Sequence, residues 1–281
     1  MSEWQAWIGR RQTQTDAIDA GVTGRWLATL DRDAPANGAA PQGFHWCLCL
    51  PDAPTARLGP DGHPLRDDGP VSFLPPVPLP RRMWASSEVE FHAPLRIGDA
   101  VTRHSRVGSV TEKQGASGRL VFVDVEHETF AGEALAVRET QSIVYREAAT
   151  ADAAPAPPGD EGFDPAGWDA HRALTPSEAL LFRYSALTFN SHRIHYDAPY
   201  AQGVERYRGL VVQGPLTATL LLDLAQRQFG DNTLTRFAFR GMSPAVAGEA
   251  LHLVLRGRAE GVELAAFAGD GRQVMSASAA L

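Results

Sequence analysis

The densest group of polar and ionisable residues in the chain lies in the run YSALTFNSHRIHYD, which contains Asn190, His192 and His195. The two histidines can exchange protons near neutral pH, whereas the amide of Asn190 can hold a water molecule but cannot take its proton. Downstream, Gly214 and the proline after it open a long apolar run. A backbone N–H at such a helix start can stabilise negative charge. These residue types predict a proton-transfer site with a donor for a developing oxyanion.

Each of these residues also has a structural explanation. Asn190 is of a type that often ends a turn, and Gly214 suits a helix cap. Asp197 is expected to be a turn residue or to orient His195 rather than to react. Position and neighbours therefore decide between a structural and a chemical role.

Composition bounds the class of protein. The chain has 281 residues, 44% of them hydrophobic and 21% charged, with a net charge of −7, which predicts a folded, acidic globule. It has no basic block, so neither nucleic acid nor an anionic membrane surface is an expected partner. The start lacks a signal peptide, and no run approaches the length of a membrane span. Cys47 and Cys49 lie two apart in a strand-like run and cannot pair or complete a zinc site, which fits a cytoplasmic protein.

A linker is predicted at residues 148–162, which are rich in Ala, Pro and Gly and lack a packing period. It separates an N-terminal module, 1–147, from a C-terminal module, 163–281. A second irregular stretch, 51–80, is loaded with Pro, Gly and Asp, and its length predicts a functional surface loop whose apolar exit lines a pocket.

The two halves contain matching sequence strings. PLRIGDAV from Pro94 recurs as PAVAGEAL from Pro244, and FAGE from Phe130 recurs as FAGD from Phe267, in the same order. The first pair is offset by 150 residues and the second by 137. A longer hairpin in the first half, around residues 112–118, would absorb the difference. The pattern predicts an internal duplication.

Strands are expected after each proline-glycine turn, at 101–110 and 251–258, with two more at 119–130 and 135–145. A helix is expected from Pro215, and its apolar residues run almost all round. Such a helix belongs in a core. The predicted fold is therefore α+β, with a buried helix wrapped by an antiparallel sheet.

The polar run resembles the motif of the MaoC-like, or (R)-specific, enoyl-CoA hydratases, which reads approximately aromatic-x-Ala-Leu-Ser-Gly-Asp-x-Asn-Pro-x-His-x-Asp. The match has no gap: the family's catalytic His falls on His195 and its final Asp on Asp197. Its catalytic Asp falls on Asn190 and its Asn on His192. The variant LTFN-x-HRIHYD is similar to the double-hotdog branch, with the type 2 3-hydroxyacyl-thioester dehydratases and the bacterial mesaconyl-CoA and itaconyl-CoA hydratases.

The resemblance implies two hotdog modules in one chain, each a core helix wrapped by an antiparallel sheet, paired like a homodimer of single hotdogs. The first half has no histidine-containing equivalent of the motif. One site per chain is thus expected, with the first half as scaffold and pocket wall. His195 is the expected general base and acid, alone or with His192. Asn190 is expected to fix the attacking water, and Gly214 to hold the thioester carbonyl.

The implied activity is hydration of an enoyl-CoA, with itaconyl-CoA or mesaconyl-CoA giving citramalyl-CoA favoured. A fatty-acid type 3-hydroxyacyl-thioester dehydratase is the alternative; a hotdog thioesterase and a non-catalytic acyl-CoA-binding protein are less favoured. A substrate carboxylate needs a cation, and Lys113 is the only lysine. Arg193 and Arg208 are therefore the expected partners. The predicted substrate-binding residues are His192, Arg193, Arg208 and Gln213.

No cofactor beyond the substrate's own CoA, and no metal, is expected, because the sequence has no glycine-rich dinucleotide motif, phosphate loop or metal-ligand cluster. The expected partner is an acyl-CoA thioester. The sequence leaves open whether the chain forms a homo-oligomer.

Overall fold

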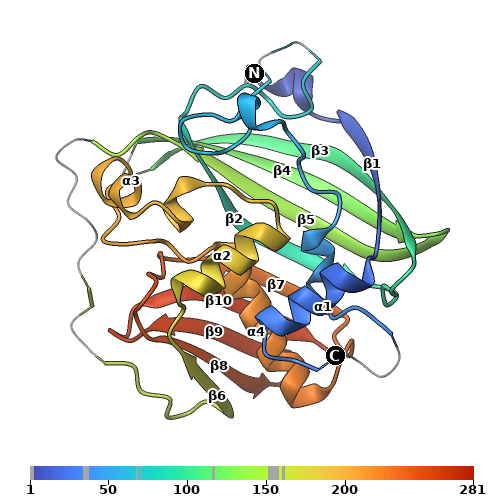
Figure 1. Ribbon diagram of the computed structural model, residues 1–281, viewed down its shortest axis with the longest axis vertical. Helices are drawn as coiled ribbons and strands as arrows, with labels where there is room; N and C mark the ends of the chain where they lie inside the picture. The colour runs from blue at the N-terminus through green and yellow to red at the C-terminus, as the bar shows by residue number, and fades with distance from the viewer. Residues whose placement is uncertain are drawn as a thin grey trace.

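The computed structural model describes residues 3–33, 38–67, 69, 71–115, 118–150, 158–159 and 162–281. In this part of the chain one antiparallel sheet has the strand order β1-β3-β4-β5-β2-β7-β10-β9-β8-β6. Figure 1 shows the sheet curving around the helices α1, α2 and α4. The α+β double-hotdog class expected from the sequence is the architecture observed.

The first half contains β1 (Arg11–Ala17), α1 (Ala20–Thr29), β2 (Arg81–Phe91), β3 (Ala100–Gly115), β4 (Gly118–Ala131) and β5 (Ala134–Arg146). The second contains β6 (Ala170–Leu174), α2 (Glu178–Leu187), α3 (Ala198–Gly203), α4 (Gly214–Phe229), β7 (Arg236–Gly241), β8 (Leu251–Arg258), β9 (Gly261–Ala268) and β10 (Gln273–Ala280). Short 3-10 helices are η1 (Gln5–Trp7), η2 (Phe44–Cys47), η3 (Thr55–Arg57) and η4 (Arg193–His195).

The strand order confirms the internal repeat. Read from the outer edge inward, the halves run β1-β3-β4-β5-β2 and β6-β8-β9-β10-β7. The repeated proline-glycine turns precede β3 and β8, and the repeated FAG strings stand at the β4–β5 and β9–β10 turns. The β3–β4 hairpin is the longer one, as expected. The halves meet where β2 pairs with β7, from Ser86 opposite Arg240 to Glu90 opposite Arg236.

The second half has the predicted core helix. Pro215 lies in the first turn of α4, and every residue from Leu216 to Gln226 is buried. The helix packs against β2, β7, β8, β9 and β10, so its apolar residues meet the sheet on several sides. Its N-cap is Gln213, and Gly214 is the first helical residue rather than the cap.

The first half departs from the expectation of a core helix in each module. Ala39 pairs with Arg96 as Val211 pairs with Val246, at matching places in the repeat. Beyond Val211 the chain forms α4, whereas beyond Ala39 the described chain forms the buried four-residue η2 and the three-residue η3 before β2 begins. The repeated strings mark turns and carry no information about the length of the helix between them.

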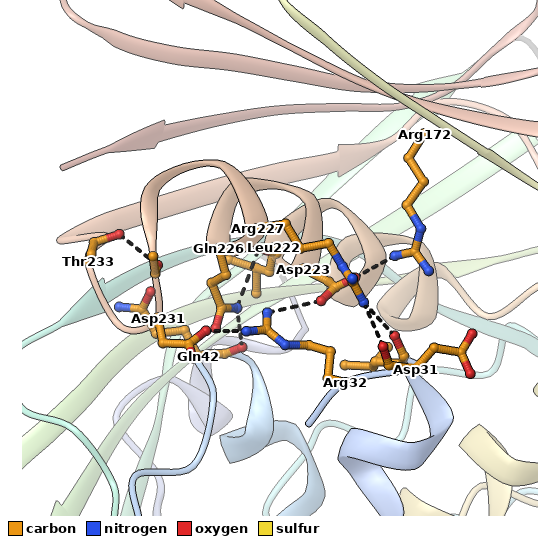
Figure 2. Close-up of polar contacts among 12 residues, drawn as sticks. Asp31, Arg32, Gln42, Arg172, Leu222, Asp223, Gln226, Arg227, Asp231 and Thr233 are labelled. Atoms are coloured by element: carbon orange, nitrogen blue, oxygen red, sulfur yellow. Dashed lines mark hydrogen bonds and ion pairs between the residues drawn. The ribbon is translucent and has the colours of Figure 1, made fainter. Parts of the chain in front are cut away.

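A buried carboxylate fixes the C-terminal part of α4 (Figure 2). Asp223 is 1% exposed and pairs with Arg227 on the same helix (2.8 Å), with Arg172 on β6 and with Arg32, which follows α1 (3.1 Å). Arg32 also pairs with Asp231 after the helix. Because three elements share one acid, these contacts join the two halves away from the β2–β7 seam.

The structure also bears on the predictions for the cysteines, the linker and membrane spans. Both cysteines are buried and free, but Cys47 ends η2, so the strand expected there is wrong. Most of the predicted linker, 148–162, lies outside the described residues, and the division into 1–147 and 163–281 stays a prediction. No helix in the described chain has the length and apolar character of a membrane span.

Candidate active site

The predicted site segment begins where α2 ends. Thr188 N–H donates to the carbonyl of Tyr184 (3.0 Å), and Asn190 N–H donates to the carbonyl of Ser185 (2.9 Å). Phe189, between them, has a φ of 46° and is 61% exposed. This is a helix-ending turn that favours glycine, the residue of the family motif at this position. The turn releases the chain from α2 immediately before Asn190.

His195 is the last residue of η4 and is 7% exposed. Its Nδ1 lies 2.7 Å from the carbonyl oxygen of Val211, so Nδ1 carries the proton and donates it. This contact leaves Nε2 as the lone-pair nitrogen, and no hydrogen-bond partner for it lies in the described chain. Burial lowers the pKa of His195 to about 4. At neutral pH the ring is therefore an uncharged base with a fixed tautomer.

Gly214 begins α4 three residues after Val211. Its N–H is one of the first-turn donors that a helix cannot satisfy internally, and no acceptor for it is found among the described residues. A Cβ placed at Gly214 would meet nothing closer than the Trp84 carbonyl oxygen at 4.0 Å. Protein packing therefore leaves space beside this donor.

Asn190 and Gln213 both hold the local backbone. The Oδ1 of Asn190 accepts from His192 N–H at 3.0 Å, which leaves its amide nitrogen for another partner. Gln213 donates through Nε2 to the Leu181 carbonyl (3.0 Å) and the Ser185 hydroxyl (2.9 Å), bracing α2 against the start of α4. The Oε1 of Gln213 is buried and has no partner.

His192 lies between two other imidazoles. Its ring centroid is 5.4 Å from that of His195, edge to face, and 4.0 Å from that of His63. Burial and the charges of these neighbours lower the pKa of His192 to about 2. Asp61 Oδ2 bonds His63 Nδ1 at 3.0 Å. Asp61, His63 and His192 offer potential metal-donor atoms within 4.8 Å of one another, but Asp61 Oδ2 already accepts a hydrogen bond from His63 Nδ1, and we assign no metal to them.

The 51–80 segment brings Asp61 and His63 to the site. Arg193 N–H donates to the Asp61 carbonyl (2.8 Å), and the Ser191 hydroxyl donates to the Gly62 carbonyl (2.5 Å). Gly62 has a φ of 86°, and a Cβ there would lie 2.0 Å from the Ser191 carbonyl oxygen. The segment was expected to be functional, but these two site residues were missed; an Asp-Gly-His string inside it was the available signal.

The two arginines expected to bind substrate are already paired. Arg193 bonds Asp197 through Nε (3.0 Å) and Nη2 (2.7 Å). Arg208 pairs with Glu249 and, at 3.7 Å, with Asp270, both of which belong to the repeated turns. The structure therefore gathers His195, His192, Gly214 and Gln213 in one neighbourhood, while the ion pairs of Arg208 are to acids outside it.

A small cleft lies beside His192, lined by Asp61, Arg81, Arg82, Met83, His192, Glu205 and Tyr207. Arg81 pairs with Glu205. In contrast, no acidic side chain in the described ranges forms an ion pair with Arg82, whose cross-strand neighbour is the buried Tyr145. A larger cavity, lined in part by Gln42, His45 and Asn232, contains none of the predicted site residues.

A family model described as "Hydroxyacyl-thioester dehydratase type 2" matches residues 43–247, most of the chain, including the site segment and α4. The chain belongs to this family. The matched range includes the 51–80 segment as well as the histidines, so both parts of the site lie inside the region that defines the type 2 dehydratases.

Two curated relatives span most of this type 2 dehydratase-family chain. A mesaconyl-C(4)-CoA hydratase of Chloroflexus aurantiacus is 41% identical over 100% of this chain and 98% of its own length. A mitochondrial hydroxyacyl-thioester dehydratase type 2 of Schizosaccharomyces pombe is 24% identical over 87% of each.

Solved structures support the fold. A MaoC-like dehydratase of Phytophthora capsici matches with a TM-score of 0.74 at 14% identity, over 100% of this chain and 97% of that one. A Mycobacterium tuberculosis protein described as a double hotdog matches with a TM-score of 0.58 at 15% identity, over 98% and 96%. These likenesses confirm the double-hotdog fold.

Proposed function

We propose that this protein is a hydro-lyase that adds water across the double bond of an enoyl-CoA thioester. The observation that carries the proposal is His195: a buried, neutral imidazole whose Nδ1 is bonded to the Val211 carbonyl and whose Nε2 is unpaired in the described chain. An unsatisfied helix N–H at Gly214 follows that carbonyl by three residues. A base beside an oxyanion donor is what this addition requires.

In the proposed step, Nε2 of His195 takes a proton from water while the water oxygen bonds to the β-carbon. The electron pair of the C=C bond moves toward the thioester carbonyl, where the Gly214 N–H stabilises the developing oxyanion. A proton then adds to the α-carbon. The free amide nitrogen of Asn190 is proposed to hold the water. The reverse sequence is dehydration.

The proposed substrate is mesaconyl-CoA or itaconyl-CoA, giving citramalyl-CoA. The 41% identity to a mesaconyl-C(4)-CoA hydratase over the whole chain supports this choice over a fatty-acid type dehydratase, whose curated relative is 24% identical. Itaconyl-CoA has an exomethylene group that is not conjugated with the thioester, so its use would require a prior double-bond shift. The reaction is proposed to need no cofactor besides the CoA of the substrate.

Arg82 is the proposed partner of the substrate carboxylate. Arg193, Arg208 and Arg81 are each neutralised by an acid. Arg82 lines the cleft beside His192 and has no acidic partner in the described chain. A dicarboxylyl thioester would supply the missing negative charge, and burying its carboxylate unpaired would be costly. We therefore assign Arg82 the role first expected of Arg193 or Arg208.

Itaconate degradation in the cytoplasm is the proposed setting. The two cysteines are buried, free thiols, as is usual in a reducing compartment. The proposed setting can be tested by locating the protein in cell fractions and by following itaconate consumption in cells that lack it.

The test is a panel of enoyl-CoA thioesters followed by loss of ultraviolet absorbance and by product mass. Mesaconyl-CoA should gain one water, and His195→Ala should lower turnover by about 10²-fold or more. Asn190→Ala should lower turnover, whereas Asn190→Asp restores the family carboxylate and should retain more. Release of free CoA would instead indicate a thioesterase, and binding without turnover an acyl-CoA-binding protein.

Arg82 is tested by comparing substrates within one variant. Arg82→Met should lower kcat/KM for mesaconyl-CoA about ten- to a hundredfold more than for crotonyl-CoA, because only the dicarboxylyl substrate loses a charged hydrogen bond. Equal losses on both substrates would remove Arg82 from carboxylate binding. Better turnover of crotonyl-CoA than of either dicarboxylyl thioester by the unmodified enzyme would favour the fatty-acid type alternative.

A further inference from the structure

Hydration involves two proton transfers, one from water and one to the α-carbon, and the segment that carries His195 offers only that residue as an available proton-transfer group. Asn190 is an amide, and its Oδ1 is bonded to His192 N–H. Asp197 caps α3 and pairs with Arg193. The His192 ring is packed between two imidazoles. A separate acid for the α-carbon, distinct from His195, therefore has to come from another part of the chain.

The 51–80 segment provides one. Asp61 accepts from the backbone N–H of His63 with Oδ1 (3.0 Å) and bonds the ring Nδ1 with Oδ2 (3.0 Å), so one carboxylate holds both the backbone and the ring. The ring rests on His192 at 4.0 Å. No hydrogen-bond partner for His63 Nε2 occurs in the described ranges. An imidazole with Nδ1 bonded to a carboxylate and Nε2 free is the arrangement of an oriented acid or base.

Docking of this segment is specific. Asp61 and Gly62 accept hydrogen bonds from Arg193 N–H and the Ser191 hydroxyl, and Pro60 accepts one from Arg193 Nη1 (2.8 Å). These bonds attach the three residues before His63 directly to the chain that carries His192 and His195. The position of His63 is thereby tied to the site and not to a free surface loop.

We propose that His63, oriented by Asp61, is the second proton-transfer residue of this site. The inference rests on the proposed hydratase function. In the hydration direction, His195 Nε2 accepts the proton of the attacking water and becomes imidazolium. Protonated His63 gives its Nε2 proton to the α-carbon as the electron pair from the C=C bond forms the new C–H bond, and His63 becomes neutral. Transfer of one proton from His195 to His63, through solvent or the intervening His192, restores both residues.

The carboxylate of Asp61 distinguishes the two roles. The ring of His63 bonds this carboxylate through Nδ1, whereas Nδ1 of the buried His195 bonds the neutral carbonyl of Val211. The other charged or titratable groups around His63 are on the site segment, η4, β2 and the turn after α3: His192, Arg193, His195, Arg82, Arg81 and Glu205. The Arg81–Glu205 pair is neutral as a unit, so Asp61 is the acid in contact with the ring.

The test compares His63→Gln, Asp61→Asn and the control His171→Gln in the full-length protein across pH, with mesaconyl-CoA as substrate. His171 bonds His252 on the outer strands, and its side-chain contacts in the described chain are with His252 and Phe163, not with the site residues. His63→Gln should lower kcat by about 10²-fold or more with little change in KM, and should remove the alkaline limb of the rate profile. Asp61→Asn should lower kcat less, because the His63 ring remains but loses the carboxylate that orients it. His171→Gln should match the unmodified protein.

Two results would overturn the proposal. One is near-normal turnover by His63→Gln. The other is a loss of turnover in His63→Gln and Asp61→Asn with both limbs of the profile unchanged, which would indicate a purely structural segment. Failure of the unmodified protein to hydrate any enoyl-CoA would instead count against the proposed function itself, so the two failures are distinguishable.

Discussion

At the scale of single residues, burial of His195 has a consequence for stability as well as for chemistry. Its pKa of about 4 is below the ordinary value of 6.5, because burial opposes the charged ring. The unfolded chain therefore binds a proton on this residue between pH 6.5 and about 4, and the folded protein does not. The stabilisation is complete above pH 6.5 and decreases as the pH falls through this window. His127 affects stability in the same direction, because burial lowers its pKa to about 4.

We predict that the free energy of unfolding falls as the pH is lowered from 7 to 5, by up to about 1.4 kcal/mol per pH unit for each such histidine. Urea unfolding at the two pH values measures this slope. His127→Gln, outside the site, should flatten the slope and keep full turnover. The carboxylates of Asp61 and Glu139 affect stability only at lower pH. Burial opposes their ionisation, but histidine neighbours still hold the pKa of each at about 2. A slope of zero between pH 7 and 5 would contradict the assigned protonation states.

The residues that the sequence could identify are those that share one short segment. The spacing of Asn190, His192 and His195 is readable because all three lie within six residues. Asp61 and His63 join them through contacts more than 120 residues apart in the chain, such as that between Ser191 and Gly62. The ion pairs of Arg193 and Arg208 are also tertiary contacts, and composition alone could not show that these charges are already neutralised.

At the scale of elements, the site depends on the close approach of the 51–80 segment to the chain after α2. We predict that Gly62→Ala displaces this segment and lowers turnover at least tenfold, because its Cβ would lie 2.0 Å from the Ser191 carbonyl oxygen. Steady-state turnover of mesaconyl-CoA measures the effect.

Gly9→Ala is the matched control. Gly9 has a φ of 88°, close to the 86° of Gly62, but a Cβ there would meet nothing within 4 Å. The control therefore carries the backbone strain without the collision, and it should keep normal turnover. Equal turnover in the two variants would show that the segment does not need its close contact with Ser191.

The polar network on α4 leads to a prediction about stability (Figure 2). Asp223→Asn leaves Arg32 and Arg172 near a buried neutral amide, so we expect a loss of about 3–5 kcal/mol in the free energy of unfolding. Glu128→Gln is the control, since its pair with Arg138 is exposed and should contribute far less to stability. Urea unfolding at neutral pH compares them. A loss below 1 kcal/mol for Asp223→Asn would show that the arginines find other partners.

Strands and turns were predictable from local pattern, and so was α4, because Pro215 and a continuous apolar run mark its start and its burial. The missing helix of the first half was not. Its place is taken by η2, whose Phe44 is fully buried, followed by a long irregular segment. Nothing in the repeated turns on either side depends on a helix between them, so the repeat predicts the sheet of both halves but the helix of neither.

At the scale of the whole molecule, the two halves are held together by more than the chain that connects them. β2 and β7 pair from Ser86 opposite Arg240 to Glu90 opposite Arg236. In addition, the ring centroids of Trp26 on α1 and Tyr184 on α2 lie 5.9 Å apart. We predict that a protease site inserted within 148–162 can be cut without separating the halves. Size-exclusion chromatography should show both fragments in one peak with turnover retained. Two separate soluble fragments would contradict a shared sheet.

The central strand pair also bears on how the chain could diverge. In an assembly of two identical subunits, every substitution is present twice, so neither subunit can lose its helix without the other losing it too. When equivalent strands such as β2 and β7 belong to one polypeptide, each copy mutates alone. Here the second copy has α4, while the first has η2, η3 and irregular chain at the equivalent place, and that chain lies against the histidines of its sister copy. In a fused chain the two copies can therefore change independently: one copy is constrained by folding, and the other is available for change.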